Sequence, residues 1–269
     1  MKNAVQEPHP FGHEPISTGR QKMTTVKVEP QGDVAVLRLD NGATNAISPL
    51  MLDELASAID VIGRAHGAMV LAGNKKLFSM GFDLPAILSL SRAGMSEFFY
   101  KFNRVACQLV TLPLPTVCAM AGHAVAGGNI LALTCDYRFA ATGKKIGLNE
   151  VQLGVPVPYL ADLLLRQIVG PRAANAMLYE GFFMNSDDAH QHGLIDEVCS
   201  QETIEERAIQ KASALSALPA SAFAAIKANR VEAILLQYEK YARQKNEIFL
   251  DCWFSDRAQG LLKEASRKF

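Results

Sequence analysis

Two glycine-containing stretches decide the fold of this chain: Phe78-Ser79-Met80-Gly81-Phe82-Asp83-Leu84 and Ala121-Gly122-His123-Ala124-Val125-Ala126-Gly127-Gly128-Asn129. Each places glycine where a predicted buried strand passes into the next element. Glycine lets the backbone turn tightly there, and its N–H group can approach a ligand without an obstructing Cβ. Two N–H groups aimed at one point form an oxyanion hole, which stabilises negative charge on a carbonyl oxygen. If the two loops converge, the protein is an enzyme that acts beside a carbonyl group.

Strand and helix patterns alternate along most of the chain. Short apolar runs predict buried strands, helical periodicity follows them, and from about residue 202 the pattern is entirely helical apart from a break at Pro219. This order predicts an α/β body with an α-helical C-terminal part. We expect a disordered tail over residues 1–22, the α/β domain over residues 23–200, and a helical region over residues 201–269.

The composition excludes several classes of protein. Lys plus Arg equals Asp plus Glu at 27 each in 269 residues, so no basic face for nucleic acid is expected. No apolar run reaches the roughly 18 residues of a membrane-spanning helix, and the N-terminal residues lack the apolar core of a signal peptide. The five cysteines have no metal-binding spacing. We therefore expect a soluble cytoplasmic protein with reduced thiols, no membrane partner and no metal.

Four segments share a pattern whose order and spacing are specific, although any one of them would be a weak match. By these segments the chain resembles the crotonase superfamily, also called the enoyl-CoA hydratase/isomerase family, over about residues 24–265. The matching segments are Asn45-Ala46-Ile47-Ser48, Leu77-Phe78-Ser79-Met80-Gly81-Phe82-Asp83-Leu84, Pro115 through Asp136, and Gly147-Leu148-Asn149-Glu150-Val151-Gln152-Leu153-Gly154.

The resemblance implies a fold, an assembly and an oxyanion hole. The fold would be a spiral of ββα units, followed by a C-terminal helical region that builds homotrimers or dimers of trimers. The oxyanion hole would consist of the backbone N–H groups of Phe82 and Gly127. Gly127 fits this role physically, because free N–H groups and the helix dipole at a helix N-terminus both favour an oxyanion.

The acid–base residues distinguish the possible reactions. By the resemblance, hydratases of the family hold a water between two glutamates; the second matches Glu150, whereas Ile130 stands at the position of the first. Isoleucine can neither accept a proton nor position water. An aspartate that other branches use would fall at Pro158. A single carboxylate fits the Δ3-Δ2-enoyl-CoA isomerases, in which Glu150 would move a proton from C2 to C4. Burial against Ile130 and Pro156 should raise its pKa.

Further residues of these segments are candidates for contact with the substrate. Each of these residues also has a purely structural interpretation. The glycines would allow a helix to pack closely on the sheet, His123 would make a structural hydrogen bond, and Leu84 would belong to the core. Coenzyme A would enter as part of an acyl-CoA thioester, so no separate cofactor is expected. The candidate substrate-binding residues are Leu77, Gly81, Asp83, Leu84, Gly128, Ile130 and His123.

Two other functions stay open at this point. One is an enoyl-CoA hydratase that adds water to a 2-enoyl-CoA, with the missing acid supplied from elsewhere or the water held by Glu150 alone. The other is a protein that binds CoA esters without turning them over, which the isoleucine at position 130 leaves possible.

Overall fold

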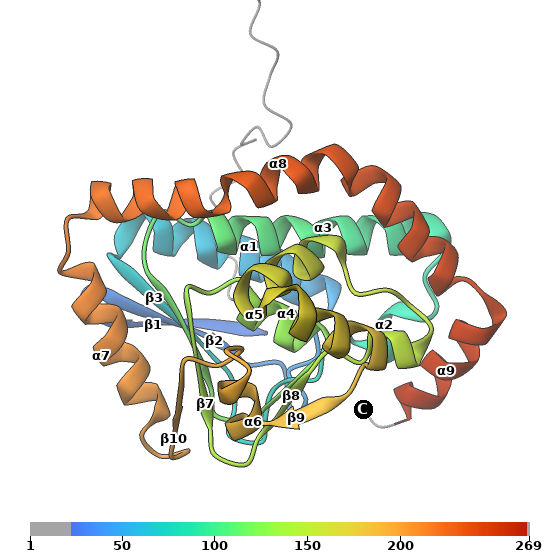
Figure 1. The fold of residues 1–269 in the computed structure, drawn as a ribbon, viewed down its shortest axis with the longest axis horizontal. Coiled ribbons are helices and arrows are strands. Elements are labelled where there is room, and N and C mark those ends of the chain that lie inside the picture. The colour runs from blue at the N-terminus through green and yellow to red at the C-terminus, as the bar shows by residue number, and fades with distance from the viewer. Residues whose placement is uncertain (1–22, 268–269) are drawn as a thin grey trace, which may run out of the picture.

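The computed structural model of the protein describes residues 23–267. The tail predicted for residues 1–22 lies outside the described residues. A six-stranded sheet forms the centre of the molecule (Figure 1). β1 and β2 pair antiparallel, and the remaining neighbours pair parallel. In spatial order the strands are β1 (Val26–Gln31), β2 (Val34–Leu39), β3 (Ala68–Ala72), β5 (Thr116–Met120), β7 (Tyr137–Ala141) and β10 (Glu197–Cys199).

A second sheet of four short strands lies beyond the carboxyl ends of the first. Its first three strands pair parallel, and the last pairs antiparallel with its neighbour. Each strand is only three residues long, and the sequence pattern predicts just one of the four, near Lys145–Leu148. In spatial order the strands are β4 (Leu77–Ser79), β6 (His123–Val125), β8 (Lys145–Gly147) and β9 (Phe183–Asn185).

The chain builds both sheets by repeating one strand–strand–helix turn. In the first turn both strands, β1 and β2, join the large sheet, whereas each of the next three turns gives one strand to the large sheet and one to the small sheet before a helix returns the chain. The predicted α/β body and its recurring units are therefore present. The helices after the three central strand pairs are α2 (Leu84–Ile87) with α3 (Arg92–Thr111), then α4 (Gly127–Leu133), then the 3₁₀ helix η1 (Glu150–Leu153) with α5 (Tyr159–Glu180).

Two helices begin with side-chain caps, of which the Ser48 cap is predicted from the sequence. In α1 (Pro49–Ala65) the Ser48 side chain accepts a hydrogen bond from the Met51 N–H at 3.2 Å, and proline occupies the first turn. In α6 (Ser186–Gln191) the Asn185 side chain accepts from the Asp188 N–H at 2.8 Å. Both caps satisfy N–H groups that have no partner inside their helix.

The sequence pattern predicts a helix from about Tyr159 that ends near residue 169, and the structure breaks α5 at this point. Gly170 interrupts the helix with a φ of 79° and a ψ of 161°, and Pro171 then opens a second helical segment. The predicted end is therefore correct, whereas the second segment up to Glu180 was not predicted. Proline occupies the first position of that second segment, which needs no N–H donor.

The C-terminal region is helical, as predicted, and it packs on the same chain. It contains α7 (Ile204–Ser216), α8 (Ala220–Trp253) and α9 (Asp256–Ser266). α7 covers one face of the large sheet, where Ile204 and Ala208 join its buried valines, and α8 runs over α3 (Figure 1). The ring of Phe249 stacks on Phe99 of α3 at 3.9 Å between centroids. Among the described residues, no helix has the length and apolar character needed to cross a bilayer.

A buried ion pair fixes α8 to the large sheet. Lys227 is 5% exposed, and its Nζ lies 2.8 Å from Asp136 Oδ2, which is next to the start of β7. The same Nζ donates to the Leu114 carbonyl at 3.1 Å, just before β5. The Asp136 carboxylate also accepts from the Thr116 N–H at 2.9 Å. Because every partner lies on the sheet or beside it, this cluster sets the position of α8.

Replacing Lys227 by methionine should destabilise the protein. The substitution Lys227→Met keeps the apolar stem but leaves Asp136 without its cation, so we expect the free energy of unfolding to fall by about 3 kcal/mol in chemical denaturation. The matched control is Lys101→Met, which breaks an ion pair at 3.0 Å with Asp53 whose side chains are 35% and 58% exposed. That change should cost less than about 1 kcal/mol. Equal losses in the two variants would contradict the role given to Lys227.

Candidate active site

The two glycine loops meet, as the sequence pattern predicts. β4 and β6 are neighbouring parallel strands, with Leu77 opposite His123, so their carboxyl ends lie at the same edge of the small sheet. A Cβ on Gly81 would lie 3.0 Å from the Gly127 nitrogen, and a Cβ on Gly128 would lie 2.4 Å from the Ser79 carbonyl oxygen. The loops therefore touch backbone to backbone, and larger residues would separate them.

The first loop is held by the segment before α1. The side chain of Asn45 is fully buried, and its Nδ2 donates to the Leu77 and Phe78 carbonyls at 3.2 Å each. The Ser79 hydroxyl donates to the Asn45 carbonyl at 2.7 Å. Asn45 has a φ of 45°, a left-handed conformation that asparagine tolerates better than most residues. The segment around Asn45 thus fixes the first glycine loop through hydrogen bonds to its backbone and to Ser79.

A parallel bridge then orients Phe82. The Ile47 N–H donates to the Gly81 carbonyl at 2.8 Å, and the Asp83 N–H donates to the Ile47 carbonyl at 3.0 Å. In this pairing the N–H of Phe82 points away from Ile47. The Phe82 ring is fixed edge-on against Phe102 at 4.8 Å between centroids. Backbone and side chain together fix the direction of this N–H.

The second loop presents the N–H of Gly127 at the start of α4. The preceding residue, Ala126, has a φ of 48° and a ψ of −122°, a conformation rare for alanine and costly to hold. Its N–H donates to the Gly147 carbonyl of β8 at 3.0 Å. Within residues 23–267, neither the Phe82 N–H nor the Gly127 N–H donates a hydrogen bond. Both are available to an acceptor from outside the chain.

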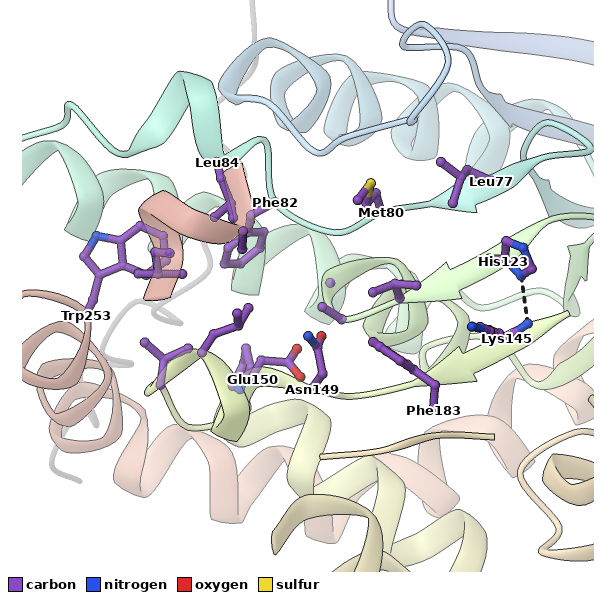
Figure 2. A pocket seen from close by; sticks show the side chains of 18 of the residues that line it. Leu77, Met80, Phe82, Leu84, His123, Lys145, Asn149, Glu150, Phe183 and Trp253 are labelled. Carbon is purple, nitrogen blue, oxygen red and sulfur yellow. Dashed lines mark hydrogen bonds between the residues drawn. The ribbon is translucent and has the colours of Figure 1, made fainter. Parts of the chain in front are cut away.

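A cavity of about 290 Å³ lies beside the two loops (Figure 2). Phe82, Gly127 and Glu150, the three residues expected to be catalytic, all line it. Glu150 is the one acidic residue among the described residues that line the cavity. The rest of the wall is mostly apolar and includes Met80, Val125, Leu153, Val155, Pro158, Phe183 and Phe249.

Glu150 is a buried carboxyl group at the start of η1. It is 6% exposed, and its Oε2 has no hydrogen-bond partner among the described residues. Burial raises the pKa of this carboxyl from 4.5 to about 7, while a hydrogen bond to its own backbone lowers it less. Figure 2 shows the carboxyl group pointing into the cavity. The increase agrees with the direction expected from the sequence.

Three candidate substrate-binding residues also line the cavity, namely Leu77, Leu84 and His123. His123 combines both roles considered for it, because it lines the cavity and its Nδ1 accepts a hydrogen bond from the Lys145 N–H at 2.8 Å. Burial, followed by the nearby charges of Lys144 and Lys145, lowers the pKa of His123. His123 and Lys145 lie together at one end of the cavity (Figure 2).

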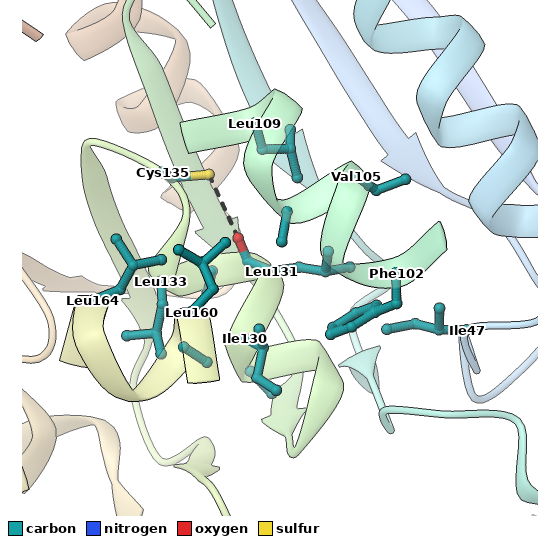
Figure 3. Packing of buried hydrophobic residues seen from close by; sticks show 14 of the residues in the cluster. Ile47, Phe102, Val105, Leu109, Ile130, Leu131, Leu133, Cys135, Leu160 and Leu164 are labelled. Atoms are coloured by element: carbon teal, nitrogen blue, oxygen red, sulfur yellow. Dashed lines mark hydrogen bonds between the residues drawn. The ribbon is translucent and has the colours of Figure 1, made fainter. Parts of the chain in front are cut away.

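The other four candidates do not line the cavity. Gly81 and Gly128 form the contact between the loops, as described above. The Asp83 side chain caps α2, where Oδ1 accepts from the Ala86 N–H at 3.2 Å. Ile130 is 2% exposed and packs in the core near Phe102 (Figure 3). These residues can shape the site from behind its surface.

Sequence reasoning missed the far wall of the cavity. Phe249 and Trp253 of α8 and Leu262 of α9 line it, although they lie about a hundred residues after Glu150 in the chain. No local motif marks them. The apolar character of the C-terminal helices was their one signal, and it predicted docking either on the body of the chain or on another subunit, with oligomerisation favoured. Asn149 and Lys145 were missed as well.

Two comparisons of sequence identify relatives. A family model described as Enoyl-CoA hydratase/isomerase matches residues 29–266. Human mitochondrial enoyl-CoA delta isomerase 1 is 31% identical over 201 residues, which is 72% of this chain and 67% of that protein. A probable enoyl-CoA hydratase of Mycobacterium avium is 31% identical over 204 residues, or 75% of this chain and 79% of that one.

Solved structures have the same architecture. The crystal structure of human mitochondrial delta3-delta2-enoyl-CoA isomerase has a TM-score of 0.87 at 28% identity and covers 91% of this chain and 98% of its own. An enoyl-CoA hydratase from Bacillus halodurans, with a TM-score of 0.82 at 24% identity over 90% of this chain and 100% of its own, supports the fold alone. The expected crotonase-like fold with C-terminal helices is confirmed, and the chain belongs to the enoyl-CoA hydratase/isomerase family.

Proposed function

We propose that this protein is an enoyl-CoA isomerase that moves the double bond of a 3-enoyl-CoA to position 2, with Glu150 as the base. One observation carries the proposal. Among the described residues that line the cavity, Glu150 is the single acidic residue. Phe82 and Gly127 line the same cavity, and their N–H groups make no hydrogen bond within residues 23–267. An isomerase needs one carboxyl group, which can take and return the same proton.

The reaction begins at C2 of the acyl chain. The Glu150 carboxylate removes a C2 proton, which the neighbouring thioester makes acidic, and the C–H electron pair forms a double bond between C1 and C2. Negative charge moves to the thioester oxygen, where the N–H groups of Phe82 and Gly127 stabilise it as a dienolate. The Glu150 carboxylic acid then gives the proton to C4. The electron pair of the C3–C4 double bond takes that proton, the C2–C3 double bond forms, and the thioester carbonyl is restored.

The surroundings of Glu150 suit this exchange. Apolar burial raises the pKa of the carboxyl to about 7, so its ionised and neutral forms are of similar free energy near neutral pH. A base whose pKa lies near the working pH can both accept and release a proton. The apolar walls around Leu153 and Val155 also exclude water from the dienolate.

An enoyl-CoA hydratase is the second candidate function. The relative from Mycobacterium avium, named a probable hydratase, matches this chain at the same identity as the human isomerase. Against hydration stands the absence of a second acid on the cavity wall within residues 23–267, since Pro158 contributes no carboxylate and Ile130 is in the core. Binding of CoA esters without turnover is the third possibility.

We place the CoA part of the thioester toward the end of the cavity that carries His123 and Lys145, because the positive charge of Lys145 suits phosphate groups. We also propose a homotrimer or a dimer of trimers in the cytoplasm. Apolar side chains on the outer surface of α8 support association, because Ile226 and Leu236 are 61% and 63% exposed. The five cysteines are unpaired, which fits a reducing compartment.

Paired assays of the wild type and Glu150→Gln test the reaction. The wild type should convert a 3-enoyl-CoA much faster than it hydrates a 2-enoyl-CoA. Glu150→Gln should lower kcat by about 10²–10⁴-fold, because the amide cannot accept the C2 proton, while calorimetry finds CoA-ester affinity nearly unchanged. Glu180→Gln, an exposed carboxylate on α5, is the control. Hydration at an equal or greater rate would overturn the isomerase assignment, and binding without any turnover would favour the third possibility.

The pH dependence follows from the raised pKa of Glu150. Activity requires the carboxylate, so kcat/KM for a 3-enoyl-CoA should rise about tenfold per pH unit and level off near pH 7. The folded protein also holds this proton more tightly than the unfolded chain, so stability falls as the pH rises from about 4.5 to 7. Glu150→Gln should therefore melt higher than the wild type at pH 8, and the gain should shrink toward pH 4.5. If kcat/KM instead levelled off near pH 4.5, the raised pKa of Glu150 would be contradicted.

Separating the loops tests the oxyanion hole. The Cβ of Gly128→Ala would lie 2.4 Å from the Ser79 carbonyl oxygen, so the two loops must move apart. We expect kcat for the isomerisation to fall by about 10²-fold, the usual loss when one oxyanion donor is misplaced. Gly260→Ala on α9 is the matched control, since its Cβ meets nothing within 4 Å. Unchanged kcat in folded Gly128→Ala would remove the support for this hole.

A further inference from the structure

Asn149 occupies a capping position but does not cap. It precedes η1 with a φ of −111° and a ψ of 17°, and its side chain makes no hydrogen bond to the N–H groups of that helix. Asparagine is among the residues most favoured at such positions because its side-chain oxygen normally accepts one of these bonds. Asn185 does this at the start of α6. The Asn149 side chain is therefore not used to cap the helix.

The Asn149 amide lies instead on the cavity wall next to Glu150. Both residues line the cavity, and Figure 2 shows the amide and the carboxyl group extending into it beside each other. The Asn149 Oδ1 is buried and has no hydrogen-bond partner among the described residues, and the same is true of the Glu150 Oε2. Buried polar atoms are paired in the great majority of cases. Two unpaired ones on consecutive residues at a cavity indicate a site that is completed during function.

We propose that Asn149 is a positioning residue for Glu150: its amide donates a hydrogen bond from Nδ2 to one carboxyl oxygen and leaves the other oxygen to move the proton. This inference rests on the isomerase function proposed above. Rotation about the Cβ–Cγ bond of Asn149 can direct Nδ2 at a carboxyl oxygen of Glu150. Nothing else in the described structure bonds to this amide and opposes the rotation.

The chemistry of the amide suits both states of the base. The carboxylate accepts the Nδ2–H bond before the C2 proton is removed, and the carbonyl oxygen of the carboxylic acid accepts the same bond afterwards. One carboxyl oxygen therefore stays fixed while the other takes the proton from C2 and gives it to C4. A carboxyl group held in this way cannot turn its plane away from the acyl chain between the two transfers.

The hydrogen bond should also leave a mark on the titration of Glu150. A donor to a carboxylate favours the ionised form, so loss of the amide should raise the pKa of the carboxyl above that of the protein with the hydrogen bond. Lys145 and His123 are the other ionisable side chains on the described cavity wall, and both remain when Asn149 is changed. A shift in the titration would therefore report the amide.

Two variants and one control make the test. Asn149→Leu and Asn149→Ala both remove the amide but differ in volume, so a packing fault would affect them differently. Gln152→Ala changes the same helix η1, where the Gln152 Nε2 donates to the Glu180 carbonyl at 3.0 Å, away from the cavity. The measurements are kcat, KM and the pH profile with a 3-enoyl-CoA, and the titration of the Glu150 carboxyl by ¹³C NMR, which needs no turnover.

We expect both Asn149 variants to lose about 10²-fold in kcat with KM nearly constant, and the acid limb and the NMR titration to move to higher pH. Gln152→Ala should retain the wild-type limb and titration. The inference would be overturned if either folded Asn149 variant kept the wild-type acid limb of the pH–rate profile and the wild-type titration of Glu150. This holds whatever the kcat or melting temperature of the variant. If the wild type shows no isomerisation, the proposed function fails, and the NMR titration still decides whether the amide bonds to Glu150.

Discussion

The close approach of two backbone segments determines the geometry of this protein's cavity. Gly128 lies where a Cβ would be 2.4 Å from the Ser79 carbonyl oxygen, and Gly81 lies where one would be 3.0 Å from the Gly127 nitrogen. Because β4 and β6 are parallel neighbours, the loops that follow them come together at one edge of the small sheet. The rare backbone conformation of Ala126 is maintained by the same contact, with its N–H bonded to β8. The surrounding packing offsets its conformational cost.

The apolar surroundings of Glu150 are a second consequence of the fold. The ββα spiral places η1 opposite the two loops, and the C-terminal helices close the far side of the cavity with Phe249, Trp253 and Leu262. A carboxyl group in such surroundings loses much of its hydration, which raises its pKa to about 7. The apolar walls that suit an acyl chain therefore also raise the pKa of Glu150. Neither the fit to the acyl chain nor the raised pKa requires a second charged residue nearby.

The C-terminal region contributes to the cavity only because it is fixed to the body of the same chain. Lys227 binds Asp136 and the Leu114 carbonyl beside the large sheet, and the stack of Phe249 on Phe99 fixes the other end of α8 against α3. Trp253 follows Phe249 by four residues on the same helix and reaches the cavity from this fixed end. The outer surface of α8 keeps exposed apolar residues such as Leu236, which remain available for association.

The sequence by itself determined the α/β order of elements, the two glycine loops, the helical C-terminal region and Glu150 as the candidate base, because each depends on residues close together in the chain. Tertiary structure alone decided what lies around them. Three of the four strands of the small sheet are too short to leave a pattern, Pro171 opens a second helical segment after the break at Gly170, and Trp253 reaches the cavity from a hundred residues away. The Asn149 side chain is buried and does not cap η1. Both properties depend on contacts between distant segments, which local sequence patterns do not encode.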